Sequence, residues 1–256
     1  MKSKVEICRN CGTKFYDNFC GNCGQKKYHR IDRKYFMDEV QYIVLHTNKG
    51  FFYTLKNILI NPGKTAREYI DGKRVKHYKP ILLAFVLSGL SVFLSHYVFK
   101  FDSLMDAFAA KTDAPLFMKS FFDFFMKWYS FIALLFLPIF SLATYLAFRK
   151  WGHNFYEHVM MNAFFMSLYT LIHTTIFSVL LYLFPDLFNV VSVLIFGSIP
   201  FLLFWFYKGI YPEQRRWKIV RRILVFAVIF VLFYFVISIV SGFLFALISP
   251  ESLREF

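Results

Sequence analysis

Charged side chains are missing from every long apolar stretch of this chain. No Asp, Glu, Lys or Arg lies deep within the five such stretches, which cover residues 80–99, 128–148, 159–184, 188–207 and 223–248. Proton- and ion-coupled transporters usually need a buried carboxylate in the membrane, so this absence weighs against that class. The chain also lacks a G-x-S-x-G motif and a convincing pair of nucleophile and base, which disfavours a hydrolase.

Two familiar signals are missing from the N-terminal part. The first 30 residues contain no apolar h-region, so we expect no cleavable signal peptide. Gly63-Lys64-Thr65 has the form of the end of a P-loop, but Ile58 stands where that motif requires its first glycine. No buried strand precedes it either, and nucleotide binding is therefore disfavoured.

Hydrophobic residues dominate the chain. They make up 57% of its 256 residues and include 36 phenylalanines, far beyond the composition of an ordinary soluble domain. Each of the five apolar stretches is about 20 residues or longer, which is enough for a helix to cross a bilayer. We therefore predict an all-α polytopic membrane protein whose membrane domain, residues 80–248, contains five transmembrane helices.

The distribution of basic residues predicts how these helices are oriented. Of the 30 Lys and Arg residues, 17 lie in residues 1–79, two in 149–158 and six in 208–222, all on one side of the predicted membrane. The other five lie in the opposite loop, residues 100–127, or in the external tail, 249–256. Basic loops favour the cytoplasm, so we expect the N-terminus inside and the C-terminus outside. The net charge of +14 is then mainly a topology signal, and nucleic acid is a disfavoured partner.

All four cysteines of the chain lie in two C-x-x-C-G motifs. Cys8, Cys11, Cys20 and Cys23 have the spacing of a closed tetrahedral site, so we predict a zinc ribbon over residues 1–28 with one structural Zn²⁺ per chain. Two disulfides or a redox C-x-x-C are the alternatives. The first needs an oxidising compartment and the second normally comes with a βαβ unit. Such ribbons bind protein or nucleic acid, and the sequence does not choose between them.

Residues 29–79 are predicted to form a cytoplasmic segment of short amphipathic helices. Apolar residues recur at helical spacing over about 33–46, and a second helix over 51–60 is too short to span a bilayer. Whether these helices lie in the membrane interface or pack on one another is open.

A junction at residues 61–80 leads from this segment into the first apolar stretch. Asn61-Pro62-Gly63 predicts a turn. Thr65 is then expected to cap a short helix, with Glu68 completing a capping box and Gly72 ending the helix.

A basic membrane-surface patch is predicted beside the apolar stretches. Its members suit anionic lipid headgroups, although a topology signal alone also explains them. They are Lys73, Arg74, Lys76, Lys79, Arg215, Arg216, Arg221 and Arg222.

Four polar residues inside the spans form a candidate site for lipid or substrate: His96, Asn162, Tyr169 and His173. Polar and ionisable groups within a membrane are functional hypotheses by default. Hydrogen bonding between helices is the alternative, since rows of small residues on the first and third spans favour close helix packing.

The start of the third span holds a candidate interfacial site made of His153, Glu157 and His158. Two imidazoles and a carboxylate invite a metal or acid–base role. The structural alternative is stronger: Asn154 and Glu157 have the spacing of a capping box, which leaves His153 just outside the helix.

With these motifs in hand, the chain resembles a bacterial family of zinc-ribbon membrane proteins that is classed as a domain of unknown function. The resemblance implies a location in the bacterial inner membrane and carries no activity with it. The five-span topology is also similar to that of the Yip family of membrane-trafficking proteins, which implies only a membrane-organising role. The family resemblance rests on residues 19–26, the junction from Thr54 to Pro80, and Glu157-His158.

We therefore expect a non-enzymatic membrane scaffold or adaptor that recruits a cytoplasmic protein partner through its ribbon. A lipid-handling or small-molecule transport protein that uses the polar row is the alternative. A membrane enzyme at the cytoplasmic interface is the third hypothesis. Self-association into a homo-oligomer is open.

Overall fold

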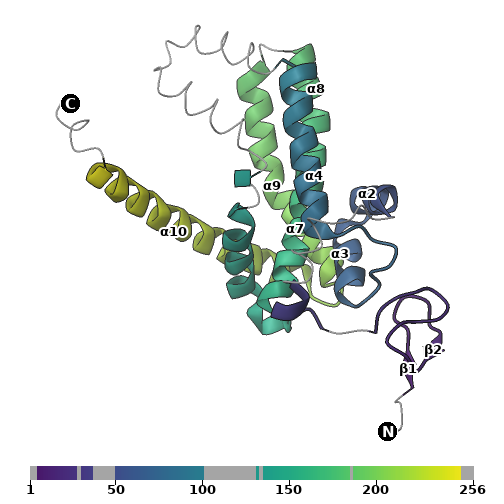
Figure 1. The fold of residues 1–256 in the computed structure, drawn as a ribbon. Coiled ribbons are helices and arrows are strands. Elements are labelled where there is room, and N and C mark those ends of the chain that lie inside the picture. The colour runs from purple at the N-terminus through teal and green to yellow at the C-terminus, as the bar shows by residue number, and fades with distance from the viewer. Residues whose placement is uncertain are drawn as a thin grey trace, which may run out of the picture.

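The computed structural model describes residues 5–27, 30–36, 50–100, 131–132, 135–184 and 187–248 (Figure 1). A small antiparallel hairpin of β1 (Glu6–Ile7) and β2 (Lys14–Phe15) lies beside one end of a helical body. The body contains α2 (Phe51–Ile60), α3 (Pro62–Ile70), α4 (Pro80–Phe93), α7 (Phe155–Ile172), α8 (Ser178–Leu183), α9 (Phe188–Ile210) and α10 (Arg216–Ile248). Another helix covers residues 135–148, and a single helical turn covers 33–36.

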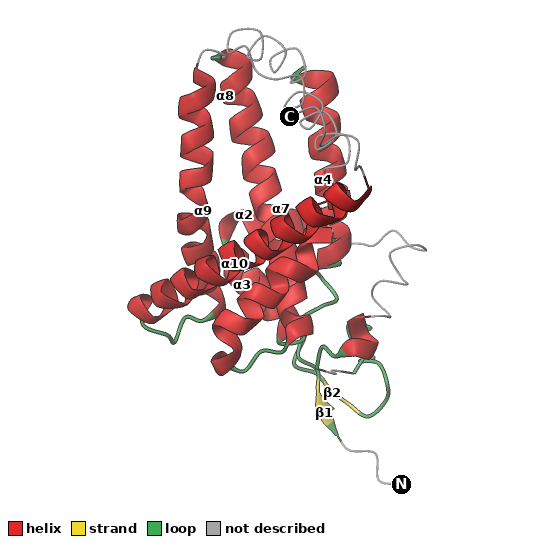
Figure 2. Cartoon of the chain, turned by 90° about the vertical axis from the view of Figure 1, so that its left-hand side faces the viewer, coloured by secondary structure: helices red, strands yellow, loops and turns green. Residues whose placement is uncertain are grey.

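Three long helices run side by side through the body (Figures 1 and 2). Pro80–Val98, Phe155–Leu183 and Val193–Ile210 are long and apolar enough to cross a membrane, with mean hydropathies of 2.0, 1.7 and 1.7. The first continues from α4 into the π-helical turn η1 (Leu94–Val98), and the second joins α7 to α8 through η3 (His173–Phe177). Three of the five predicted apolar spans are thus helices of spanning length and composition, which suggests a membrane protein.

Small side chains face one another where α4 packs on α7. Ser88 and Ser91 on α4 and Ser167 on α7 are buried, and the hydroxyls of Ser91 and Thr174 are hydrogen-bonded. Small residues let helix backbones approach closely, and a hydroxyl pair between them needs no water. The predicted packing role of the small residues on the first and third apolar stretches is confirmed.

The other two predicted spans stay predictions. The stretch 128–148 includes residues outside the described ranges, and its described part is the helix of residues 135–148. The stretch 223–248 belongs to α10, which slants away from the three long helices (Figure 1). Beyond Phe230 it has strongly exposed large apolar side chains, for example Phe235 at 58% and Ile239 at 69%. The predicted external loop 100–127 and tail 249–256 fall mostly or wholly outside the described residues.

The prediction that Thr65 caps the junction helix is wrong, because α3 begins earlier, at Pro62. Proline suits the first helical position, since its φ is already helical and its missing N–H would have no intrahelical partner there. The Thr65 hydroxyl donates instead to the carbonyl of Asn61 at 2.9 Å, and Glu68 pairs with Lys73. The predicted end of the helix is confirmed: Gly72 has a φ of 109°, a left-handed conformation that favours glycine.

Two glycines bring the backbones of α3 and α9 into direct contact. A Cβ on Gly63 would lie 1.9 Å from the carbonyl oxygen of Phe206 and 2.7 Å from the Cα of Gly209. A Cβ on Gly209 would lie 2.8 Å from the Cα of Gly63. Neither position tolerates a side chain without moving a helix, so this crossing fixes α3 across the end of α9.

We predict that Gly63→Ala lowers the free energy of unfolding by about 1–3 kcal/mol, because the methyl group must push two backbones apart. Thermal unfolding in mild detergent measures the change. Gly197→Ala is the matched control on α9, since nothing lies within 4 Å of its added Cβ. Alanine there should leave the protein unchanged or stabilise it by up to about 1 kcal/mol. Equal thermal unfolding midpoints for Gly63→Ala and wild type would contradict the close backbone contact between α3 and α9.

Candidate metal centre and its contacts with the membrane helices

Two turns with the same backbone pattern present the four cysteines. In the first, the N–H of Cys8 donates to the carbonyl of Thr13 at 2.9 Å. In the second, the N–H of Cys20 donates to the carbonyl of Gln25 at 2.8 Å. Each turn contains a C-x-x-C pair: the β1–β2 hairpin flanks the first, and a bridge between Phe19 and Lys26 flanks the second.

A glycine closes each of these turns. Gly12 and Gly24 have φ values of 77° and 71°, and each donates its N–H to the carbonyl of the first cysteine of its motif at 2.8 Å. Non-glycine residues rarely adopt this left-handed conformation. The glycines that follow the two motifs therefore let the chain curl around the thiols.

The four thiols are arranged as a metal site. Cys8 and Cys23 have sulfurs 3.6 Å apart, Cys11 and Cys20 have sulfurs 3.5 Å apart, and all four lie within 4.8 Å of one another. A tetrahedral ion with sulfur at 2.3 Å needs sulfur–sulfur separations of about 3.8 Å. The cysteines are free and are not disulfide-bonded. The donor set and its spacing therefore fit an ion of the zinc type.

The thiols differ in how easily they lose a proton. Hydrogen bonding to Thr13 lowers the pKa of the exposed Cys11 to about 6, whereas burial raises that of Cys8 to about 11. Thiolate is the form that binds metal, so an ion at this site must displace a proton from Cys8 at neutral pH.

The ribbon docks on the helical body through Gln25. This side chain is only 6% exposed; its amide donates to the carbonyl of Gly72, and its oxygen accepts from the N–H of Arg74 at 3.4 Å. The Arg9 guanidinium donates to the neighbouring carbonyl of Asp71 at 3.2 Å. The ribbon is thus seated on the turn that ends α3.

Part of the predicted basic patch is engaged in this region. The Arg74 guanidinium lies 4.4 Å from the ring centre of Tyr35 and donates to the carbonyl of Tyr69 at 3.1 Å. The hydroxyls of the two tyrosines are 3.0 Å apart. Lys73 pairs with Glu68 at 3.1 Å. Arg74 therefore ties the segment that follows the ribbon to α3.

The same segment is fastened to the start of α7 by Arg30. Its guanidinium binds both carboxylate oxygens of Glu157 at 3.0 Å and donates to the carbonyl of Gly152 at 2.6 Å. The amide of Asn154 donates to the carbonyl of Ile31, which is fully buried. The predicted capping box between Asn154 and Glu157 is confirmed, and Arg30 neutralises its carboxylate.

The candidate interfacial site does not assemble as a metal centre. Nδ1 of His153 lies 2.9 Å from the hydroxyl of Tyr211, outside α7 as predicted. His158 is fully buried with its ring 6.4 Å from that of His153, and neither of its nitrogens has a hydrogen-bond partner among the described residues. Within the described ranges, the four cysteines are the group that converges on one point.

Asn162 joins three helices by hydrogen bonds. Its amide donates to Thr144 at 2.7 Å and to Ser141 at 3.2 Å, and its oxygen accepts from the hydroxyl of Tyr207 at 3.2 Å. Every member of this cluster is fully buried. The geometry favours the packing alternative for Asn162.

The rest of the predicted polar row lies further along the helices. The rings of Tyr169 and His173 are 5.6 Å apart on consecutive turns of α7 and η3. His96 lies on η1 with an exposed side chain. The row is therefore divided, with Asn162 in a separate buried cluster.

The loop before α10 is linked to α3 by an ion pair. Arg67 lies 2.7 Å from Glu213, which raises the pKa of the guanidinium and lowers that of the carboxyl. Both groups are substantially exposed, so the pair contributes little. Lys76, Arg215, Arg216 and Arg221 are exposed, and Lys79 and Arg222 are half-buried.

A family model described as "Protein of unknown function (DUF3667)" matches residues 48–92. The matched stretch contains α2, α3 and nearly all of α4, including the turn that receives Gln25. No curated protein and no solved structure matches the chain. The family match agrees with the resemblance of the junction to a domain of unknown function.

Sequence reasoning missed the two residues that hold the ribbon in place. Gln25 follows the second cysteine motif directly, and its place in the resembling stretch of residues 19–26 was the available signal. Arg30 carried no signal of its own, because nothing in the sequence relates it to Glu157.

We predict that the purified chain holds one zinc ion and that Cys20→Ser loses it. Removing a thiolate from a closed four-cysteine site leaves an open coordination position and weakens binding. Elemental analysis after gel filtration gives the metal content per chain. Asn22→Ser changes an exposed residue in the same turn and should keep the metal. A metal-free wild type purified under reducing conditions would contradict the prediction.

Acid should destabilise the end of the bundle that contains His77 and His153. Burial lowers the pKa of His153 and of His77 below the ordinary value of 6.5, although Glu157 opposes the shift at His153. The unfolded protein therefore binds protons at these histidines more readily than the folded protein does. The contribution of the neutral histidines to the free energy of unfolding is fully present above pH 6.5 and declines as the pH falls below that value. Each histidine contributes at most about 1.4 kcal/mol per pH unit.

Thermal unfolding between pH 8 and pH 5.5 tests this expectation. The midpoint of the wild type should fall over the acidic part of the range, and His153→Gln should give a shallower fall. The double variant with His77→Gln should be the flattest. Identical slopes for all three proteins would show that these imidazoles are not held neutral.

Proposed function

We propose that this protein is a scaffold of the bacterial inner membrane whose zinc ribbon, fixed to the cytoplasmic ends of its helices, binds a cytoplasmic protein partner. The observation that carries the proposal is the docked ribbon. The ribbon and the segment after it are hydrogen-bonded to the ends of α3 and α7 through Arg9, Gln25 and Arg30. The ribbon is therefore held in one orientation next to the apolar helices.

The ribbon presents apolar side chains that its own small core does not use. Its core consists of Phe15 and two of the cysteines, whereas Ile7, Tyr16 and Phe19 are 64%, 60% and 56% exposed. Exposed aromatic and aliphatic groups on a rigid module are typical anchors of protein interfaces. This surface favours a protein partner over nucleic acid for the ribbon.

The position of the basic loops supports the orientation in this proposal. Contacts from Arg30 to Gly152, from His153 to Tyr211 and from Arg67 to Glu213 bring the ribbon segment, the junction and the two basic loops to one end of the bundle. That clustering suits a cytoplasmic N-terminus under the positive-inside rule. Five spans would then place the C-terminus outside.

Affinity purification in mild detergent with mass spectrometry tests the proposal. A partner captured by the wild type should be reduced at least about tenfold by the double variant Ile7→Ser/Tyr16→Ser, because interface anchors each contribute about 1–2 kcal/mol or more. Zinc content shows that the variant ribbon is still folded.

Val75→Ser is the matched control, since Val75 is an exposed apolar residue outside the ribbon. It should retain the partner. A partner that survives the ribbon double variant, or one that Val75→Ser removes equally, would contradict recruitment by the ribbon.

A further inference from the structure

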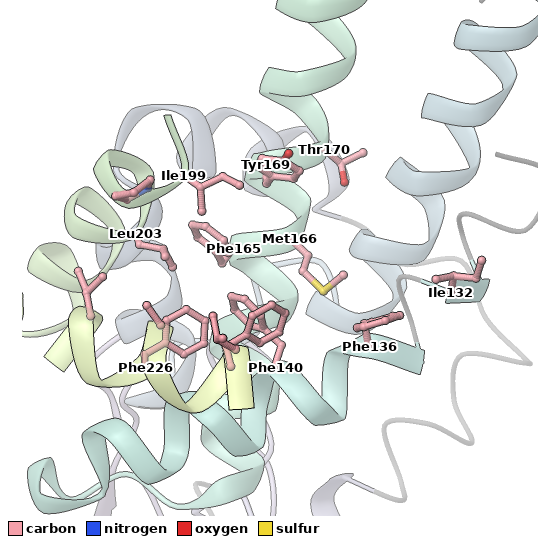
Figure 3. Close-up of a pocket in the computed structure, with 15 residues that line it drawn as sticks. Ile132, Phe136, Phe140, Phe165, Met166, Tyr169, Thr170, Ile199, Leu203 and Phe226 are labelled. Carbon is pink, nitrogen blue, oxygen red and sulfur yellow. The ribbon is translucent and has the colours of Figure 1, made fainter. Parts of the chain in front are cut away.

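A cavity of about 520 Å³ lies between α10 and the rest of the bundle (Figure 3). We call it the α10 pocket. Its wall is built by side chains from the helix of residues 135–148 and from α7, α9 and α10, among them Phe140, Phe165, Leu203, Phe226 and Phe230. A volume of this size is typical of a site for a small molecule or a single chain.

The wall of the α10 pocket is almost wholly hydrocarbon. Among the residues that line it, only Tyr169 and Thr170 carry polar side-chain atoms, and both lie together on α7 (Figure 3). A water molecule needs two to four polar partners, so this space does not suit water. Tyr169 and Leu203 also belong to helices that are long and apolar enough to cross a membrane, which places the pocket where lipid chains are the surrounding solvent.

Along the edge of the pocket, the side chains of α10 change from basic to aromatic. Lys218, Arg222, Phe226 and Phe230 follow one another at four-residue spacing, so they form one ridge of the helix. The two cations lie on the side of the basic loops, and the two aromatic rings line the pocket. The described residues provide no ion-pair partner for either cation.

We propose that the α10 pocket binds one hydrocarbon chain of an anionic membrane phospholipid whose headgroup pairs with Arg222 and Lys218. Hydrocarbon is nearly as well solvated in the bilayer as in the pocket, so the chain alone gives little preference among lipids. The charges therefore select the lipid, and the pocket holds its chain. Exposed Trp217, beside these cations, suits the headgroup layer.

Native mass spectrometry of the full chain, released from vesicles of equal parts phosphatidylglycerol and phosphatidylcholine, tests the proposal. The wild type should retain one phosphatidylglycerol per chain. Ala227→Phe fills the pocket and should remove it, whereas Val228→Phe, on the exposed side of α10, should not. Equal retention of the two lipids by the wild type, or full retention in Ala227→Phe, would overturn the site.

The headgroup contact has its own matched pair of variants. Arg222→Gln should lower the preference for phosphatidylglycerol about fivefold, since one basic residue at an anionic headgroup contributes about that factor. Arg221→Gln removes the same charge from the neighbouring ridge and should leave the preference unchanged. The same loss in both variants would show a general attraction to anionic lipid and no specific headgroup site.

A photo-crosslinking residue at position 227 keeps the test independent of whether Ala227→Phe folds. Crosslinks to phosphatidylglycerol in excess over those formed from position 228 support the proposal. Crosslinks from position 227 to a peptide of residues 101–130 would show that the chain fills its own pocket. Crosslinks to a second protein would identify a protein interface. Either result would overturn the lipid site.

Discussion

The close approach of α3 and α9 at Gly63 and Gly209 is the constraint on which the end of the bundle next to the ribbon depends. Because no side chain separates the two backbones, α3 lies directly across α9 and its final turn takes a set position. That turn offers the carbonyl groups of Asp71 and Gly72 to the ribbon. The same helix carries Arg67 to the loop that leads into α10. One small-residue contact thus places three otherwise separate parts of the chain.

Local chemistry explains how much of this could be predicted from sequence. The cysteine turns and the box at Asn154 and Glu157 depend on residues a few positions apart, so their spacing was sufficient. Three apolar helices were predicted for the same reason, since their length and composition are properties of single segments. The error at Thr65 came from interpreting Asn61-Pro62-Gly63 as a turn. Pro62 is instead the first residue of α3, where its missing N–H would have no intrahelical partner.

The contacts between distant segments could not be predicted in this way. Gln25 reaches the end of α3 across 47 positions and Arg30 reaches Glu157 across 127, and no local pattern encodes such a pairing. The sequence drew attention to Asn162 as a polar residue in an apolar stretch, and it lies within α7. Its separation from His173 depends on which neighbours α7 meets, and that is a property of the packed bundle. The α10 pocket likewise arises from the slant of one helix.

Gln25 contacts the end of α3 and Arg30 contacts the start of α7, yet only four residues lie between them in the chain. Such a connection spans at most about 17 Å, so a ribbon that loses its hydrogen bond to Gly72 stays close to the turn that ends α3. Its effective concentration there is then in the range of millimolar or above, as for other short tethers. Any molecule that needed the surface beneath Gln25 would compete against that concentration. One that bound the outward side of the ribbon would meet no such competition.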